Sequence, residues 1–117
     1  MHLTTMPQFD ISAARYFAPP EILSLEGKLK TNAKCGQAIA GTAGLMRRLR
    51  HPHVLRQSER GFYPIVVYLI NEAENEIILI DVIDGMDEFK AMMKDPWTWA
   101  KAINVGRLLQ ALWDKVQ

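Results

Sequence analysis

The sequence predicts a single α+β domain, in which a small antiparallel sheet packs with an N-terminal helical hairpin and a C-terminal helix. Three observations lead to this prediction. Two apolar, β-branched runs stand close together in the chain, proline-punctuated helical segments precede them, and an amphipathic segment follows them. The 117 residues fit one domain over 1–117, and residues 95–117 are expected to form the C-terminal helix.

The N-terminal segment predicts a strand and then a helix. Residues 2–6 are expected to form a short edge strand. Asp10 is a suitable N-cap for a helix that runs to Phe17, because its carboxylate can accept a hydrogen bond from an unpaired backbone N–H group. The Pro19-Pro20 pair then ends this helix.

A second helix is expected directly after these prolines. Pro20 fits its first turn, where the missing N–H group costs nothing. Apolar side chains at i, i+3 and i+7 share one face of this helix: Ile22, Leu25 and Leu29. Asn32 and Gly36 mark its end, and the small, polar residues 36–44 predict a loop or a short strand.

Residues 45–50 predict a strand with mixed faces. Alternation places Met46, Arg48 and Arg50 on one side and the intervening residues, two leucines and Arg47, on the other. Either face then holds an arginine beside apolar side chains. We therefore expect a bulge or an exposed face here.

The clearest local pattern is a β-hairpin formed by residues 64–70 and 76–83, with the polar segment 71–75 between them. Such continuous apolar runs predict central strands that are covered on both faces. For the helices, we expect packing on one face of the antiparallel sheet.

After the hairpin, Asp84-Gly85 is expected to turn the chain and residues 86–94 to form a short helix. Asp95 and Pro96 then suit the start of the last helix. Its wide apolar stripe predicts packing on the sheet or a homodimer contact, and it consists of Trp99, Ile103, Leu108, Leu109, Leu112, Trp113 and Val116.

The charge distribution is more informative than the net charge of +1. Residues 47–60 contain five arginines, two histidines and a single acid, whereas residues 71–88 contain acids but no lysine or arginine. A localised basic segment predicts an anion-binding surface. A solvated edge strand and loop is the alternative interpretation.

The expected location is the cytoplasm. Cys35 is the single cysteine, which fits a reducing compartment. The N-terminus lacks the basic and apolar regions of a signal peptide, and the apolar runs are too short to cross a bilayer. We therefore expect a soluble protein without membrane contact.

Two segments carry a resemblance to a known family. Residues 38–50, with Gly41-Thr42-Ala43-Gly44-Leu45 followed by Arg47-Arg48-Leu49-Arg50, are similar to the I-x-G-T-G-G-L-R-K-x-R pattern of HigB/RelE-like toxins. Residues 61–68 and 80–85 resemble the F-P-x-x-V-x-Y strand and the V-x-H-G turn of ParE-like toxins. Asp84 stands where ParE-like members often have histidine.

The resemblance is therefore to the RelE/ParE toxin superfamily of type II toxin–antitoxin modules. It implies a toxin that cleaves mRNA without a metal or cofactor and blocks translation, and that is silenced by a cognate antitoxin. A ParE-like inhibitor of DNA gyrase without nuclease activity is one alternative. A degenerate family member that serves as a protein-binding module is another.

RNA cleavage needs a base for the ribose 2′-OH, a cation for the phosphorane and an acid for the leaving oxygen. The candidate catalytic residues are Arg50, Arg60, His53 and Tyr63. The candidate RNA- or phosphate-binding residues are Arg47, Arg48, Arg56 and His51. Surface arginines, a simple His-Pro-His turn and a half-buried sheet tyrosine are the alternative interpretations. If the family fold applies, four of the arginines are expected to converge on one anion: Arg48, Arg50, Arg56 and Arg60.

Overall fold

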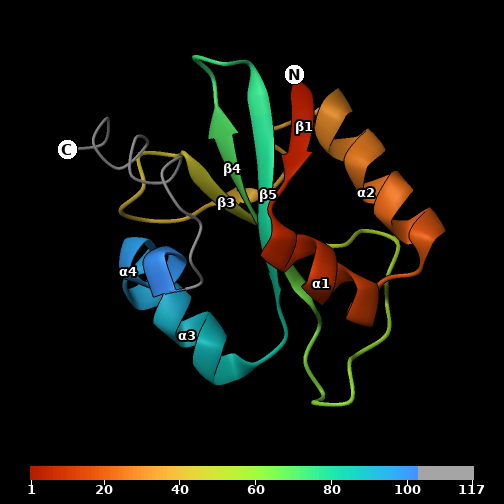
Figure 1. Cartoon of the computed structure of the whole chain (residues 1–117). Coiled ribbons are helices and arrows are strands. Elements are labelled where there is room, and N and C mark those ends of the chain that lie inside the picture. Colours follow the sequence, from red (N-terminus) through yellow and green to blue (C-terminus); the bar gives the residue numbers. More distant parts are fainter. Residues whose placement is uncertain (103–117) are drawn as a thin grey trace.

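The structure, a computed structural model, describes residues 1–102 and confirms the α+β class (Figure 1). Along the chain, two helices follow the first strand, four strands follow these helices, and two helices end the described part. The elements are β1 (His2–Thr5), α1 (Pro7–Tyr16), α2 (Pro19–Thr31), β2 (Gln37–Ala38), β3 (Met46–Arg50), β4 (Ile65–Asn71), β5 (Glu76–Ile83), α3 (Met86–Lys94) and α4 (Pro96–Ala102).

The five described strands form one sheet in the order β1-β5-β4-β3-β2. The predicted edge strand at the N-terminus is confirmed, but it runs parallel to β5, with His2 opposite Glu76. The other strand pairs are antiparallel. The sheet is thus mixed, because the chain from α1 to β4 serves as the long crossover that a parallel pair requires.

The predicted hairpin is confirmed as β4 and β5. Its register contains one bulge, since Val67 pairs with Asp81 while the next residue, Tyr68, pairs with Leu79 and leaves Ile80 as the additional residue. Strand β3 pairs regularly with β4, so the bulge expected as one option for residues 45–50 is not there. The arginines of β3 reach solvent instead: Arg50 is exposed, and Arg47 and Arg48 are half-buried.

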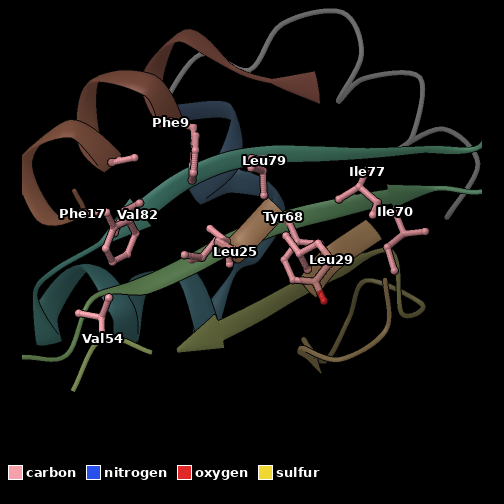
Figure 2. Close-up of a cluster of buried hydrophobic side chains, with 12 residues drawn as sticks. Phe9, Phe17, Leu25, Leu29, Val54, Tyr68, Ile70, Ile77, Leu79 and Val82 are labelled. Carbon is pink, nitrogen blue, oxygen red and sulfur yellow. The ribbon is translucent and has the colours of Figure 1, made fainter. Parts of the chain in front are cut away.

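Helices cover both faces of the sheet, so the expectation that they cover one face is wrong (Figure 1). Helices α1 and α2 pack on one face, where Figure 2 shows a cluster that includes Phe9, Leu25, Leu29, Tyr68 and Leu79. Helices α3 and α4 pack on the other face with Met92, Trp97 and Trp99. The reason is the one that the apolar runs predicted: β4 and β5 present buried side chains to both sides.

The first helix begins four residues earlier than predicted. Met6, not Asp10, is its N-cap, and Pro7 occupies the first turn. Asp10 lies within that turn, where the positive end of the helix dipole stabilises its carboxylate. The carboxylate also accepts a hydrogen bond from Thr5 Oγ1 at 3.2 Å. The second helix starts at Pro19 and ends before Asn32, as predicted.

The last described helices match the prediction as far as they can be followed. Helix α3 covers residues 86–94. Asp95 Oδ1 accepts a hydrogen bond from the Thr98 backbone N–H at 3.3 Å and Pro96 opens α4. The stripe from Ile103 to Val116, and the homodimer contact expected from it, lie outside the described residues. Within residues 1–102 we find no helix with the length and apolarity needed to span a bilayer.

Candidate functional site

A cleft of about 410 Å³ lies between the C-terminal end of α1, the loop of residues 54–60, and the segment that leaves β5. Its volume falls in the range of sites that hold small ligands or single nucleotides. We call it the arginine cleft, and the charged and hydroxyl-bearing side chains that line it are Arg15, Tyr16, Arg56, Ser58, Glu59, Arg60 and Asp84. Three segments that are distant in the sequence therefore meet here.

A tight turn at residues 58–61 sets the loop side of the arginine cleft. The Ser58 N–H donates to the Phe62 carbonyl at 3.0 Å, and the Gly61 N–H donates to the Ser58 carbonyl at 2.9 Å. Gly61 has a φ of +72°, a conformation that glycine adopts without the strain of a side chain. The Arg60 N–H also donates to Ser58 Oγ at 3.2 Å, so Ser58 fixes the backbone beside Arg60.

Asp84 supplies a buried carboxylate at the other wall. Only 4% of this residue is exposed, and Ser58 Oγ donates a hydrogen bond to its Oδ1 atom. Burial raises the pKa of the Tyr16 hydroxyl, the Asp84 carboxylate raises that pKa further, and Arg15 and Arg60 oppose the shift. A carboxylate, a phenol and two cations thus act on one another electrostatically at this point.

Arg60 lies against the backbone of Gly85. A Cβ atom at position 85 would stand 3.1 Å from three atoms of the Arg60 guanidinium group, so the absence of a side chain makes room for this cation. Among residues 1–102, Arg15 and Arg60 take part in no ion pair. Their charges are therefore available to an anion in the cleft.

Arg56 has a different role from that predicted. Its two terminal nitrogens donate to the two carboxylate oxygens of Glu21 at 2.8 and 2.6 Å, and Nη2 also donates to the Tyr16 carbonyl at 3.0 Å. This bidentate pair lowers the pKa of Glu21 to about 2, together with the Ala18 N–H that the same carboxylate accepts. Arg56 borders the arginine cleft but is already neutralised.

Arg50 and Tyr63 form a separate pair outside this cleft. The Arg50 guanidinium carbon lies 3.7 Å from the centre of the Tyr63 ring, a cation–π contact. Arg50 pairs across the sheet with Ile65, whose side chain packs against the core under α3 and α4. The structure therefore does not bring these two predicted catalytic residues together with Arg60.

The remaining arginines of β3 also have their own partners. Arg47 Nη1 donates to the Gly36 carbonyl at 2.9 Å, and Arg48 Nη2 donates to Gln37 Oε1 at 2.7 Å. The Arg48 guanidinium also lies 5.0 Å from the centre of the Phe89 ring. The expected convergence of four arginines is not found, because Arg48 and Arg50 stack on Phe89 and Tyr63, whereas Arg56 and Arg60 line the arginine cleft.

The two predicted histidines, His51 and His53, do not line the arginine cleft. His51 is buried, with 1% exposure, and its Nε2 atom lies 2.6 Å from the Glu21 carbonyl oxygen. The His53 side chain is exposed, while its backbone N–H donates to His51 Nδ1 at 3.1 Å. His51 is thus enclosed by protein partners and cannot contact RNA in this arrangement.

Sequence reasoning missed Arg15, Tyr16 and Ser58 and treated Asp84 only as part of a turn. Tyr16 is the last residue of α1 and Asp84 directly follows β5, and only the tertiary fold brings them together. The one available signal was Asp84 at the position of a family histidine. Within the described part of the chain, no three His, Cys, Asp or Glu side chains are grouped to hold a metal ion.

The Glu21–Arg56 pair predicts a specific dependence of stability on pH. Because the folded-state pKa of Glu21 is depressed, its contribution is complete above the ordinary value near 4.5 and is lost as pH falls toward about 2. We expect Glu21→Gln to cost about 1 kcal/mol at pH 7, the scale of a helix cap and a partly exposed ion pair. The cost should shrink at pH 2.5, as measured by urea unfolding.

Glu72→Gln is the matched control, because Glu72 pairs with Lys34 while both side chains are 64% exposed. Such a pair contributes little, so this substitution should leave stability unchanged at either pH. An equal cost of Glu21→Gln at pH 7 and pH 2.5 would contradict the role given to its carboxylate.

Comparison with known proteins adds no assignment. No protein-family profile matches the chain, and no curated protein matches it at a significant level.

Proposed function

We propose that this chain is the toxin of a type II toxin–antitoxin module, and that it cleaves mRNA in the cytoplasm at the arginine cleft. The resemblance of residues 38–50 and 61–68 to RelE/ParE toxins motivates the class of protein. The observation that carries the chemistry is the meeting of Asp84, Tyr16 and Arg60 in one cleft. A cognate antitoxin is the proposed partner that silences it.

These three side chains match the three needs of RNA cleavage. The Asp84 carboxylate accepts the proton of the ribose 2′-OH, and the 2′ oxygen then forms a bond to phosphorus. Arg60 stabilises the charged phosphorane through its planar, permanently charged guanidinium group. As the bond from phosphorus to the 5′ oxygen breaks, the Tyr16 hydroxyl gives that oxygen a proton. The products are a 2′,3′-cyclic phosphate and a free 5′-OH, so no metal or cofactor is needed.

The surroundings support these roles. The Tyr16 hydroxyl is protonated at neutral pH, as an acid requires, because the ordinary pKa of a tyrosine, 10.0, is already far above 7. Ser58 orients the Asp84 carboxylate, and Arg15 offers a second cation for a neighbouring phosphate. In this proposal Arg60 keeps its predicted phosphate role, whereas Asp84 and Tyr16 take the acid–base roles that the sequence suggests for His51 and His53.

Inducing this protein in bacteria should arrest growth, and translation should fall before DNA breaks appear. Pulse labelling with an amino acid, a DNA-damage reporter and primer extension on mRNA measure these events. Asp84→Asn and Tyr16→Phe should abolish the mRNA ends, and Tyr63→Phe, which removes a hydroxyl outside the cleft, should preserve them. Cleavage that persists in both cleft variants would overturn the assignment of the site.

Inhibition of DNA gyrase is the second candidate, and one observation favours it. His51, His53 and Tyr63 all lie apart from the arginine cleft, and the net charge of +1 is modest for a protein that acts on the ribosome. An early DNA-damage response with intact mRNA would select this function. Normal growth with confirmed soluble expression would leave the protein-binding module.

A further inference from the structure

The loop that carries the cleft residues is fastened to the start of α2. The loop connects β3 to β4 (Figure 1). It begins at His51, and its residues Arg56, Ser58 and Arg60 line the cleft. Two of its residues contact Glu21: His51 through the Glu21 carbonyl, and Arg56 through both carboxylate oxygens. We call Glu21, His51, the His53 backbone N–H and Arg56 the loop clamp.

The hydrogen bonds of His51 define one tautomer. The Glu21 carbonyl oxygen can only accept, so Nε2 must carry the hydrogen in the 2.6 Å contact. The His53 backbone N–H can only donate, so Nδ1 must present its lone pair in the 3.1 Å contact. These partners match the neutral imidazole and conflict with the imidazolium, which would direct a second N–H group at the N–H of His53.

The His51 ring is buried, and the groups around it are either aromatic or already paired with other residues. The ring is 1% exposed and its centre lies 5.1 Å from that of Phe17. The ionisable groups near it are Glu21 on α2 and Arg56 and His53 on the loop, and the His53 ring centre is 6.0 Å away. The Glu21 carboxylate is already shared between Arg56 and the Ala18 N–H, which limits what it can offer an imidazolium.

We propose that His51 and Glu21 are positioning residues for the arginine cleft, and that the loop clamp holds residues 53–60 in place only while His51 is neutral. Protonation breaks the bond from His53 N–H to Nδ1 and releases the loop from α2. Arg60 and Ser58, which depend on that loop, then lose their places beside Gly85 and Asp84. The clamp itself does not depend on the proposed function, whereas its consequence for RNA cleavage rests on it.

Amide exchange tests the clamp without any RNA. In the wild type, protection of the His53 amide, corrected for intrinsic exchange, should fall about tenfold between pH 7.5 and pH 5.5, the effect of losing one buried hydrogen bond. In His51→Gln, whose side-chain amide does not titrate, that dependence should disappear. His53→Gln should retain it, because the clamp uses only the backbone of residue 53.

A second measurement needs only the wild-type protein, so it remains possible if His51→Gln does not fold. The ¹⁵N shifts of the His51 ring should show the hydrogen on Nε2 at pH 7.5, and the loss of this tautomer should coincide with the loss of loop protection. Constant protection across this range, or a response that persists in His51→Gln, would overturn the proposal.

Cleavage of a single-stranded RNA oligonucleotide tests the consequence. Wild-type kcat should fall at acidic pH together with the protection of the loop, and His51→Gln should remove that part of the pH profile. Glu21→Asp should restore part of the activity lost in Glu21→Ala, because a carboxylate can again reach Arg56. If the amide results hold but wild-type protein does not cleave RNA, the clamp stands and the proposed function fails.

Discussion

Replacing Arg60 by alanine should lower the rate of RNA cleavage by about 10²- to 10³-fold, the usual effect of removing one group that stabilises transition-state charge. The guanidinium group lies at Gly85 and acts on Tyr16, beside the carboxylate proposed as the base. Since residue 60 is exposed, its replacement should change the free energy of unfolding by no more than about 0.5 kcal/mol. Cleavage assays and thermal unfolding on the same preparation measure both effects.

Arg50→Ala is the matched control for this experiment. Arg50 is also an exposed arginine of the basic segment, but it stacks on Tyr63, and neither residue lines the arginine cleft. Its loss should reduce cleavage far less than the loss of Arg60. Arg60→Lys should recover part of the activity, since lysine keeps the charge but not the bidentate geometry. Equal losses in the two alanine variants would show that the cleft is not the working site.

Gly36→Ala should destabilise the protein by about 3 kcal/mol, the upper range for overpacking a core. A Cβ atom at this position would lie 2.5 Å from Tyr68 Oη and 2.8 Å from the Arg48 carbonyl oxygen. Tyr68 cannot withdraw freely, because its hydroxyl accepts from the Gly36 N–H at 2.9 Å and donates to the Ala33 carbonyl at 2.8 Å. Burial is also the main cause that raises the Tyr68 pKa to about 12.

Gly27→Ala should have the opposite effect on stability. Gly27 lies inside α2, and a Cβ atom there would meet nothing within 4 Å. Alanine should therefore stabilise the protein by up to about 1 kcal/mol, the difference in helix propensity. Urea unfolding of both variants measures the contrast. A Gly36→Ala protein as stable as the wild type would show that Tyr68 and β3 do not confine this turn.

Much of the fold was predictable because its elements have strong local patterns. The two apolar runs of the hairpin, the prolines between α1 and α2, and the Asp95-Pro96 start of α4 each act within a few residues. The parallel position of β1 could not be predicted, because no local pattern specifies which strand an edge strand joins. The start of α1 was misplaced because Pro7 opens the helix without a side-chain cap.

The site was less predictable for a physical reason. The basic segment drew attention to Arg60, which lines the arginine cleft, but proximity in the sequence does not decide where each side chain of that segment lies. Arg50 stacks on Tyr63 whereas Arg60 lines the arginine cleft, and His51 turns inward to a backbone carbonyl. Tyr16 and Asp84 become neighbours only through tertiary packing, so their joint role has no counterpart in any sequence motif.

The position of β1 also affects when the arginine cleft can form during synthesis of the chain. Strand β1 is synthesised before its only strand partner among the described elements, β5, and the chain from α1 to β4 lies between them. Contacts of such long sequence separation form late, after the intervening chain has been made. Tyr16 likewise cannot meet Asp84 until the chain between them has been made. A nascent chain therefore has no assembled arginine cleft until the residues through Asp84 have left the ribosome.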